Sequence, residues 1–139
     1  MTTSSPDEIR FTVPGEPQGK GRARVGTIAG KARMFTPAKT VQYESLIALA
    51  AQEAMNGNDL FHGPVMVEVV MHCPIRQSWS KKKQAQALAG EIYPTSKPDA
   101  DNCLKAVCDA LNGVAWKDDT QATDIHMRKR FSNIPRVDV

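Results

Sequence analysis

Cysteine and histidine are scarce in this chain of 139 residues, and neither forms a metal-binding pattern. The cysteines Cys73, Cys103 and Cys108 are an odd set without a CxxC pair, and the three histidines are scattered along the chain. These spacings argue against a structural zinc site and against a disulfide framework. Reduced, buried thiols are the simpler interpretation, and they fit a cytoplasmic protein.

Long apolar runs are also absent. No segment approaches the roughly 20 apolar residues of a membrane-spanning helix, and the first residues lack the charged and apolar regions of a secretion signal. No repeat or long linker divides the chain, whose length suits one domain with its own core. We therefore predict a soluble, cytoplasmic protein without membrane contact, formed by one domain over residues 1–139 with a disordered Ser/Thr-rich tail over residues 1–7.

The formal net charge is only +3, but the charge is unevenly distributed. Between Pro17 and Tyr43 the chain has basic residues and no acidic one, whereas acidic residues concentrate between Asp99 and Asp124. A segment rich in Gly, Lys and Arg is often only a solvated loop. Uninterrupted positive charge of this length, with further basic residues around residue 129, is nevertheless typical of proteins that contact nucleic-acid phosphates.

Hydrophobic periodicity predicts an α/β (α+β) domain in which helices flank a single mixed sheet. The segment over residues 16–33 is expected to be a basic loop with a short hairpin near Ala29-Gly30, and Thr36 is expected to cap the first helix. Pro135 is expected to end regular structure after the last strand. Strands are predicted over residues 9–13, 34–35, 65–73 and 124–131, and helices over residues 37–55, 81–89 and 101–111.

Residues 97–119, which read KPDADNCLKAVCDALNGVAWKDD, combine acidic residues with a lysine and an amphipathic helix. Asp99 and Asp101 are two residues apart and would point to the same side of an extended segment, with the helix starting at Asp101 or at the next residue. Lys105 follows Asp101 by four residues, so its ammonium can reach the space in front of the carboxylates. A lone Asp-x-Asp is more often a helix cap or turn, but here the pair Asp118–Asp119 follows the helix.

Several carboxylates gathered together repel one another unless a cation lies between them. Oxygen ligands favour Mg²⁺ or Mn²⁺, which also accept phosphate oxygens. A calcium EF-hand is excluded, because counting Asp99 as the first loop position places Leu104 at the required glycine and Ala110 at the bidentate glutamate. Together with the basic segments, the acids favour a metal-dependent phosphodiesterase in which Lys105 positions the phosphate or stabilises the leaving oxygen.

The chain resembles the RusA-type crossover junction endodeoxyribonucleases, the Holliday junction resolvases of bacteria and their prophages. The resemblance rests on KPDADN, LKAVCDALNG and VAWKDDTQ, with VPGEPQGKGRAR and FTPAKTVQYE upstream, in matching order from about Phe11 to Arg130. It implies a small mixed α/β homodimer that nicks opposing strands of a four-way DNA junction, in recombination and repair, with Mg²⁺ or Mn²⁺. The essential residues that it implies are Asp99, Asp101, Lys105 and Asp119, with Asp118 as a neighbouring metal ligand.

The choice between Asp118 and Asp119 as the essential ligand stays open at this point. So do two other functions: a less selective metal-dependent nuclease that acts on flaps or single strands, and a non-catalytic DNA-binding module whose acids are only caps. The residues that we expect to contact DNA are Lys20, Arg22, Arg24, Lys31, Arg33, Lys97, Arg128 and Arg130.

Overall fold

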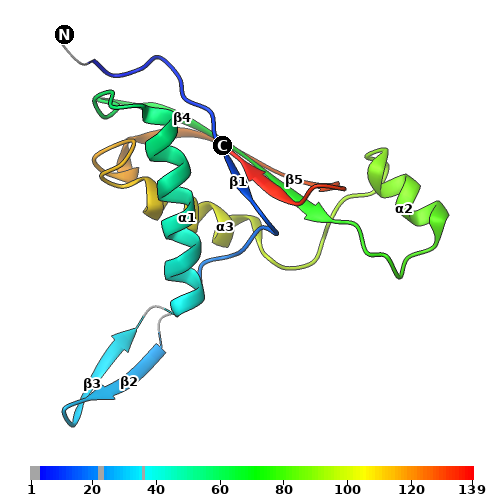
Figure 1. Cartoon of the computed structure of the whole chain (residues 1–139), viewed down its shortest axis with the longest axis horizontal. Coiled ribbons are helices and arrows are strands. Elements are labelled where there is room, and N and C mark those ends of the chain that lie inside the picture. Colours follow the sequence, from blue (N-terminus) through cyan, green and yellow to red (C-terminus); the bar gives the residue numbers. More distant parts are fainter. Residues whose placement is uncertain (1–3, 22–23, 36) are drawn as a thin grey trace.

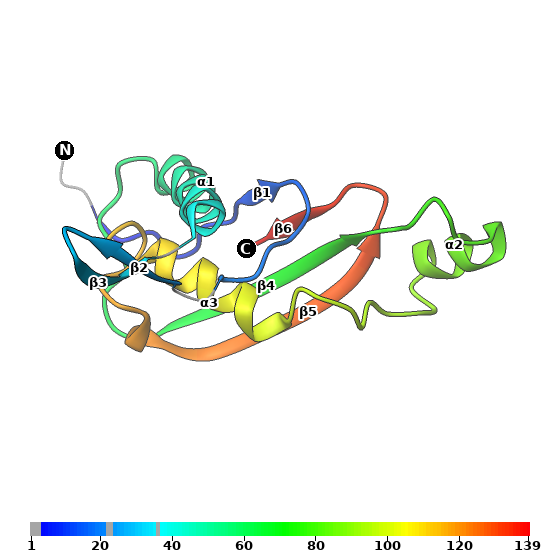
Figure 2. The same ribbon diagram turned by 90° about the horizontal axis from the view of Figure 1, so that it is seen from below.

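The computed structural model of the chain describes residues 4–21, 24–35 and 37–139. A four-stranded mixed sheet in the order β1-β6-β4-β5 carries α1 and α3 on one face, while the hairpin β2-β3 and the helix α2 project from this body (Figures 1 and 2). The strands are β1 (Thr12–Pro14), β2 (Arg24–Ile28), β3 (Lys31–Phe35), β4 (Val65–Pro74), β5 (Ala122–Ser132) and β6 (Arg136–Asp138). The helices are α1 (Ala38–Met55), α2 (Lys81–Leu88), α3 (Ala100–Leu111) and the short 3₁₀ helix η1 (Asp119–Gln121).

The predicted mixed sheet flanked by helices is therefore confirmed. Strand β4 is at its centre, with β5 parallel on one side and the short β6 antiparallel on the other. Successive side chains of a strand point to opposite faces, and in β4 the valines Val67 and Val69 are buried under the helices. Met66 and Glu68 point to the other face and are exposed. We call this second face the open face of the sheet.

The core lies between the sheet and the two long helices. From α1, Ile47 is fully buried, and from α3, Cys103 and Val107 are fully buried against it. Leu104 is only partly buried, because the helix turns Cys103 and Ala106 toward the core. Within the described residues, none of the helices is both long and apolar enough to cross a membrane.

The basic loop contains a longer hairpin than the sequence indicated. Strands β2 and β3 pair from Arg24 with Phe35 to Ile28 with Lys31, around the predicted turn. Ala29 and Gly30 both have positive φ, 52° and 76°, which is the backbone conformation of a tight two-residue hairpin turn. The hairpin projects away from the sheet near the start of α1 (Figure 1).

Some boundaries differ from the predictions. Pro37 is the N-cap of α1 and not its first helical residue, and Thr36 lies outside the described residues. The strand predicted over residues 9–13 is limited to Thr12–Pro14, because its partner β6 is equally short. That partner, which follows Pro135, was missed, since three residues are too short for a periodic pattern. The expected tail over residues 1–7 is anchored from Ser4 onward, where the Asp59 N–H donates to the Ser4 carbonyl at 3.2 Å.

The three cysteines provide a test of this core. All three thiols are free and buried, and burial raises the pKa of Cys103 to about 12 and that of Cys108 to about 11. We therefore expect iodoacetamide at pH 8 to leave Cys103 and Cys108 unmodified in the folded protein, and to alkylate all three cysteines after denaturation, as measured by mass spectrometry. Rapid native alkylation of Cys103 would show that this core is not packed as described.

Candidate functional site

The first pair of predicted site residues lies at the start of α3. Asp99 is the N-cap, with φ −69° and ψ 146°, and its carbonyl accepts from the Cys103 N–H at 3.1 Å. The prediction that the helix begins at Asp101 or Asn102 is therefore wrong, and Asp101 lies in the first helical turn. The Asp99 side chain makes no capping hydrogen bond, so its carboxylate is not used as a cap. Both carboxylates are exposed at the helix end where the backbone dipole favours negative charge.

A reversal of the chain after α3 brings the second acidic pair back toward the helix. Gly113, with φ 76°, begins the turn, and its N–H donates to the Trp116 carbonyl at 2.7 Å. The indole Nε1 of Trp116 donates to Asn112 Oδ1 at 2.7 Å, and its ring is buried at 2% exposure. This anchored ring directs residues 117–119 back along α3, and η1 contacts that helix.

Gln121 holds the second acidic pair in place. Its Oε1 accepts from the backbone N–H groups of Lys117 at 3.0 Å and Asp118 at 3.3 Å. Its Nε2 donates to the carbonyls of Phe61 at 2.9 Å and Gly63 at 3.1 Å, just before β4. One amide thus joins the acidic segment to the loop that leads into the central strand. Gln121 was not among the predicted site residues, although the motif VAWKDDTQ contains it.

Asp119 lies near Cys108, in the second half of α3. Burial is the main cause of the raised pKa of Cys108, and the negative charges of Asp119 and Asp109 raise it further, while Lys105 opposes them. These three charged groups therefore surround the same part of the helix. Cys108 follows Asp101 by seven residues, roughly 10 Å along a helix axis. The charge of Asp119 therefore acts on the second half of α3, whereas Asp101 lies in its first turn.

The structure does not bring all the predicted carboxylates into one cluster. Within residues 4–21, 24–35 and 37–139, no three His, Cys, Asp or Glu side chains are close enough together to hold a metal ion. Asp99 and Asp101 form one acidic pair, and Asp118 and Asp119 form the other. Their roles as metal ligands stay predictions, and so does the choice between Asp118 and Asp119.

The basic residues predicted to contact DNA lie on different parts of the molecule. Lys31 and Arg33 are exposed on the projecting hairpin, and Lys97 is exposed just before Asp99. Arg22 lies outside the described residues, and Arg24 is in β2. Arg128 and Arg130 pair in register with Val70 and His72, so they point to the open face of the sheet, away from α3.

Lys129 lies near the acids, although the sequence grouped it only with the other basic residues of its strand. It pairs in register with the buried Met71, so it points to the same side of the sheet as α3. Its Nζ donates to the Ser96 carbonyl at 2.7 Å, three residues before Asp99. The available signal was a lysine at an otherwise apolar position, between Met127 and Phe131 on one face of the predicted strand.

Lys20 is held in a group of ion pairs. Its Nζ lies 2.6 Å from Asp109 Oδ2 and 2.8 Å from Glu44 Oε1, and Lys105 Nζ lies 3.4 Å from the same Asp109 oxygen. A contact between Lys20 and DNA stays a prediction, but the structure shows that this lysine joins the N-terminal loop to α1 and α3. At Gly19, a Cβ would lie only 3.0 Å from Asn102 Cβ, so the loop can cross the first turn of α3 because this residue lacks a side chain.

The sequence of the chain is similar to those of known proteins. The family model described as endodeoxyribonuclease RusA matches residues 14–139, which include all four of the residues implied to be essential. The chain belongs to the RusA endodeoxyribonuclease family. The uncharacterised protein YqaN of Bacillus subtilis (strain 168) is 42% identical over 135 residues, which cover 96% of this chain and 94% of that relative. Membership of this family makes the chain a nuclease related to DNA recombination.

In this RusA-family nuclease, the charges around Asp109 stabilise the loop that crosses α3. Burial alone would raise the pKa of Asp109, but hydrogen bonds and attraction from Lys20, with attraction from Lys105, lower it below its ordinary value. Burial also opposes the charged form of Lys20, yet its hydrogen bonds to Asp109 and Glu44 raise the pKa of the ammonium. Both shifts favour the ionised pair in the folded protein.

These shifts predict how stability depends on Lys20 and on pH. Lys20→Met should lower the free energy of unfolding by about 1–3 kcal/mol at pH 7, because it leaves partly buried carboxylates without their partner. The Asp109 contribution is present above its unfolded pKa of about 4 and is lost as pH falls through its lower folded pKa. The Lys20 contribution is present below about pH 10 and is lost as pH rises through its raised folded pKa.

Urea unfolding at pH 3, 5, 7 and 9 measures the difference in the free energy of unfolding between the wild type and Lys20→Met. The difference should be constant from pH 5 to 9 and smaller at pH 3. Lys31→Met, in the exposed hairpin, is the matched control and should change stability little. A Lys20→Met effect no larger than that of the control would contradict a stabilising role for this ion pair.

Proposed function

We propose that the chain is an Mg²⁺-dependent endodeoxyribonuclease that acts as a homodimer and resolves Holliday junctions by paired, symmetric nicks, with Mn²⁺ able to replace Mg²⁺. The observation that carries the proposal is the family match over residues 14–139, which contains Asp99, Asp101, Lys105 and Asp119. A junction with twofold symmetry that needs two cuts is suited to a twofold enzyme.

The chemistry of the donor side chains is consistent with Mg²⁺. This ion keeps several waters and uses one or two carboxylates together with substrate phosphates, so it does not need a closed cage of protein ligands. Asp99, Asp101 and Asp119, with Asp118 as a neighbour, are the residues that would hold it. When bound, a divalent ion supplies a more acidic water and neutralises charge on the phosphate.

The lysines near the acids would bind the phosphate and stabilise the leaving oxygen. The Lys105 side chain is 63% exposed, and its Nζ lies 3.4 Å from Asp109 Oδ2. A positive charge there can hold a phosphate oxygen and stabilise the leaving oxygen as the P–O bond breaks. Lys97 and Lys129 add positive charge near the first turn of α3, which favours binding of the DNA backbone at this site.

Asp101→Asn tests the proposed metal ligand. We expect the cleavage rate to fall by more than about 100-fold, because the amide removes a negative charge from the ligand set. Residues that only orient metal ligands usually have smaller effects. Cleavage of a labelled four-way junction with Mg²⁺ gives the rate, and a gel shift without Mg²⁺ gives junction binding, which should be retained. Asp124→Asn, an exposed acid in β5, is the matched control. Loss of junction binding in Asp101→Asn would instead give this acid a structural role.

The substrate preference is tested with DNA alone. The wild-type protein, Mg²⁺ and equal amounts of a four-way junction, a linear duplex, a flap and a single strand of related sequence should give symmetric nicks only in the junction. Comparable rates on flaps or single strands would favour the less selective nuclease. No cleavage of any of them, together with retained binding, would favour the DNA-binding module.

Gln121→Leu tests whether the position of the second acidic pair matters. The variant loses four hydrogen bonds that join the acidic segment to the loop before β4, so the carboxylates of that segment should be less well placed. We expect cleavage to fall by about 10–100-fold and the Mg²⁺ concentration for half-maximal rate to rise, as for other residues that orient ligands. Gln42→Leu, on the exposed side of α1, is the control. An unchanged Mg²⁺ requirement in Gln121→Leu would contradict this role.

A further inference from the structure

The helix α2 and the two segments that connect it to the rest of the chain, residues 75–96, extend beyond the body of the molecule. We call this segment the α2 projection. Figures 1 and 2 both show α2 at one end of the long axis and the hairpin β2-β3 toward the other, with α3 between them. Ala87 is buried, but most of α2 is exposed, and Leu88 is 57% exposed. Burial of apolar surface in the core therefore does not explain this helix.

The α2 projection is nevertheless attached to the end of β5 by specific contacts. The Trp79 ring packs edge-to-face on Phe131, with ring centroids 5.2 Å apart. On the open face of the sheet, the Arg130 guanidinium lies 4.8 Å from the centre of the Tyr93 ring. Gln84 Nε2 donates to the Trp79 carbonyl at 2.8 Å and so ties α2 to the segment before it. These contacts fix the direction in which α2 presents its side chains.

The first turn of α2 consists of three exposed lysines, Lys81, Lys82 and Lys83. Like charges on successive residues repel one another, and they lie at the end of the helix where the backbone dipole disfavours cations. Lys82 is turned about 140° around the helix from the buried Ala87, so it points away from the body of the molecule. This arrangement makes the helix less stable, and it therefore indicates a binding surface.

The positive charge of the α2 projection is not neutralised by acidic residues. Among the ion pairs that the described residues form, none involves the three lysines. Lys83 instead places its ammonium 4.1 Å from the centre of the Trp79 ring, a contact in which the ammonium keeps its charge. Over residues 75–96 the sequence has a fourth basic residue, Arg76, and only one acidic residue, Glu91.

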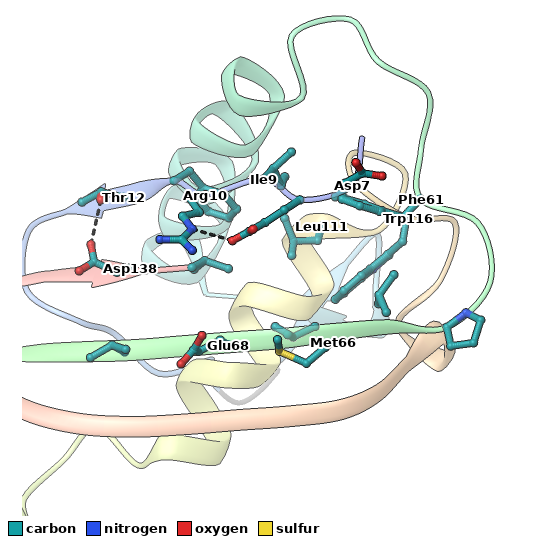
Figure 3. Close-up of a pocket in the computed structure, with 18 of the residues that line it drawn as sticks. Asp7, Ile9, Arg10, Thr12, Phe61, Met66, Glu68, Leu111, Trp116 and Asp138 are labelled. Atoms are coloured by element: carbon teal, nitrogen blue, oxygen red, sulfur yellow. Dashed lines mark hydrogen bonds and ion pairs between the residues drawn. The ribbon is translucent and has the colours of Figure 1, made fainter. Parts of the chain in front are cut away.

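Several basic residues elsewhere in the molecule are paired with acids. Arg10 lies 2.6 Å from Glu8, beside the cavity between the N-terminal segment and β4 (Figure 3). Arg136 lies 3.2 Å from Asp138, which lines the same cavity. The lysines of α2 differ from these arginines, because their charge remains available to an anionic ligand.

We propose that the α2 projection is a second DNA-contact surface, on which Lys81 and Lys82 bind backbone phosphates of the junction away from the bond that is cut. This inference rests on the proposed function, because it takes the DNA substrate of that nuclease as the ligand. Lysine ammonium groups attract phosphates whatever the base sequence, and each contact releases counterions from the DNA. The surface therefore strengthens substrate binding and takes no part in the chemical step.

Fluorescence anisotropy with a labelled four-way junction, without Mg²⁺ and over a range of KCl concentrations, tests the proposal. In Lys81→Ala/Lys82→Ala, the slope of log K against log salt should become less steep by about one for each lysine, and affinity at about 0.1 M KCl should fall at least about fivefold. Alanine is the better helix former, so α2 stays folded in this variant. Lys81→Arg/Lys82→Arg keeps both charges and should bind as the wild type does. An unchanged slope in the alanine variant would overturn the proposal and would assign this surface to another anionic partner, such as an acidic protein.

Cleavage kinetics with Mg²⁺ separate this role from a catalytic one. The alanine variant should raise KM for the junction at least about fivefold and leave kcat within about twofold of the wild-type value, because a distant contact binds substrate and transition state equally. Arg10→Ala, which removes an ion-paired charge, is the control and should change neither the salt slope nor KM. A fall in kcat without a change in KM would contradict the proposal. If the wild type bound the junction without cutting it, the proposed function would fail, whereas the salt slopes would still decide whether α2 binds DNA.

Discussion

The burial of one side of α3 is the constraint on which the rest of the site depends. Cys103 and Val107 are fully buried and Leu111 nearly so, and fully burying one large apolar side chain contributes about 1.5–3 kcal/mol. Rotating the helix would expose this stripe, so its rotation is fixed by the core. Asp101 and Lys105 lie on the other side and must therefore face solvent together, where an ionic site can form without burying unpaired charge.

Two further contacts fix the positions of the segments that pack against α3. The chain reverses around the buried ring of Trp116, so Asp119 returns to the vicinity of Cys108 in α3, and Lys20 joins the N-terminal loop to Asp109. Neither contact is formed between two acidic residues. The Asp99 side chain makes no capping hydrogen bond and the Asp101 carboxylate is exposed, so both remain available for a cation or for water.

The elements that the sequence predicted correctly are those whose signals are local. The helical period of α3, the hairpin around Ala29-Gly30 and the alternation in β4 and β5 each depend on neighbours along the chain. The features that were missed depend on distant partners. Strand β6 is a strand only because β1 and β4 flank it, and Lys20 is an ion-pair residue only because Asp109, far along the chain, meets it. Similarly, the position of Lys129 on the side of α3 was not predicted, because charge alone does not show which face of β5 lies over that helix.

The opposite directions of neighbouring basic residues on β5 bear on how DNA would be bound. Lys129 lies on the side of α3, whereas Arg128 and Arg130 lie on the open face, and β5 is the edge strand of the sheet. A straight duplex lying on one face would meet only one of these two sets. DNA that used both sets would have to pass around the β5 edge, or would have to present two arms that diverge there. The several arms of the proposed junction substrate could contact both sets of basic residues without bending a continuous duplex. Bending a duplex costs free energy, and that cost increases with the bend.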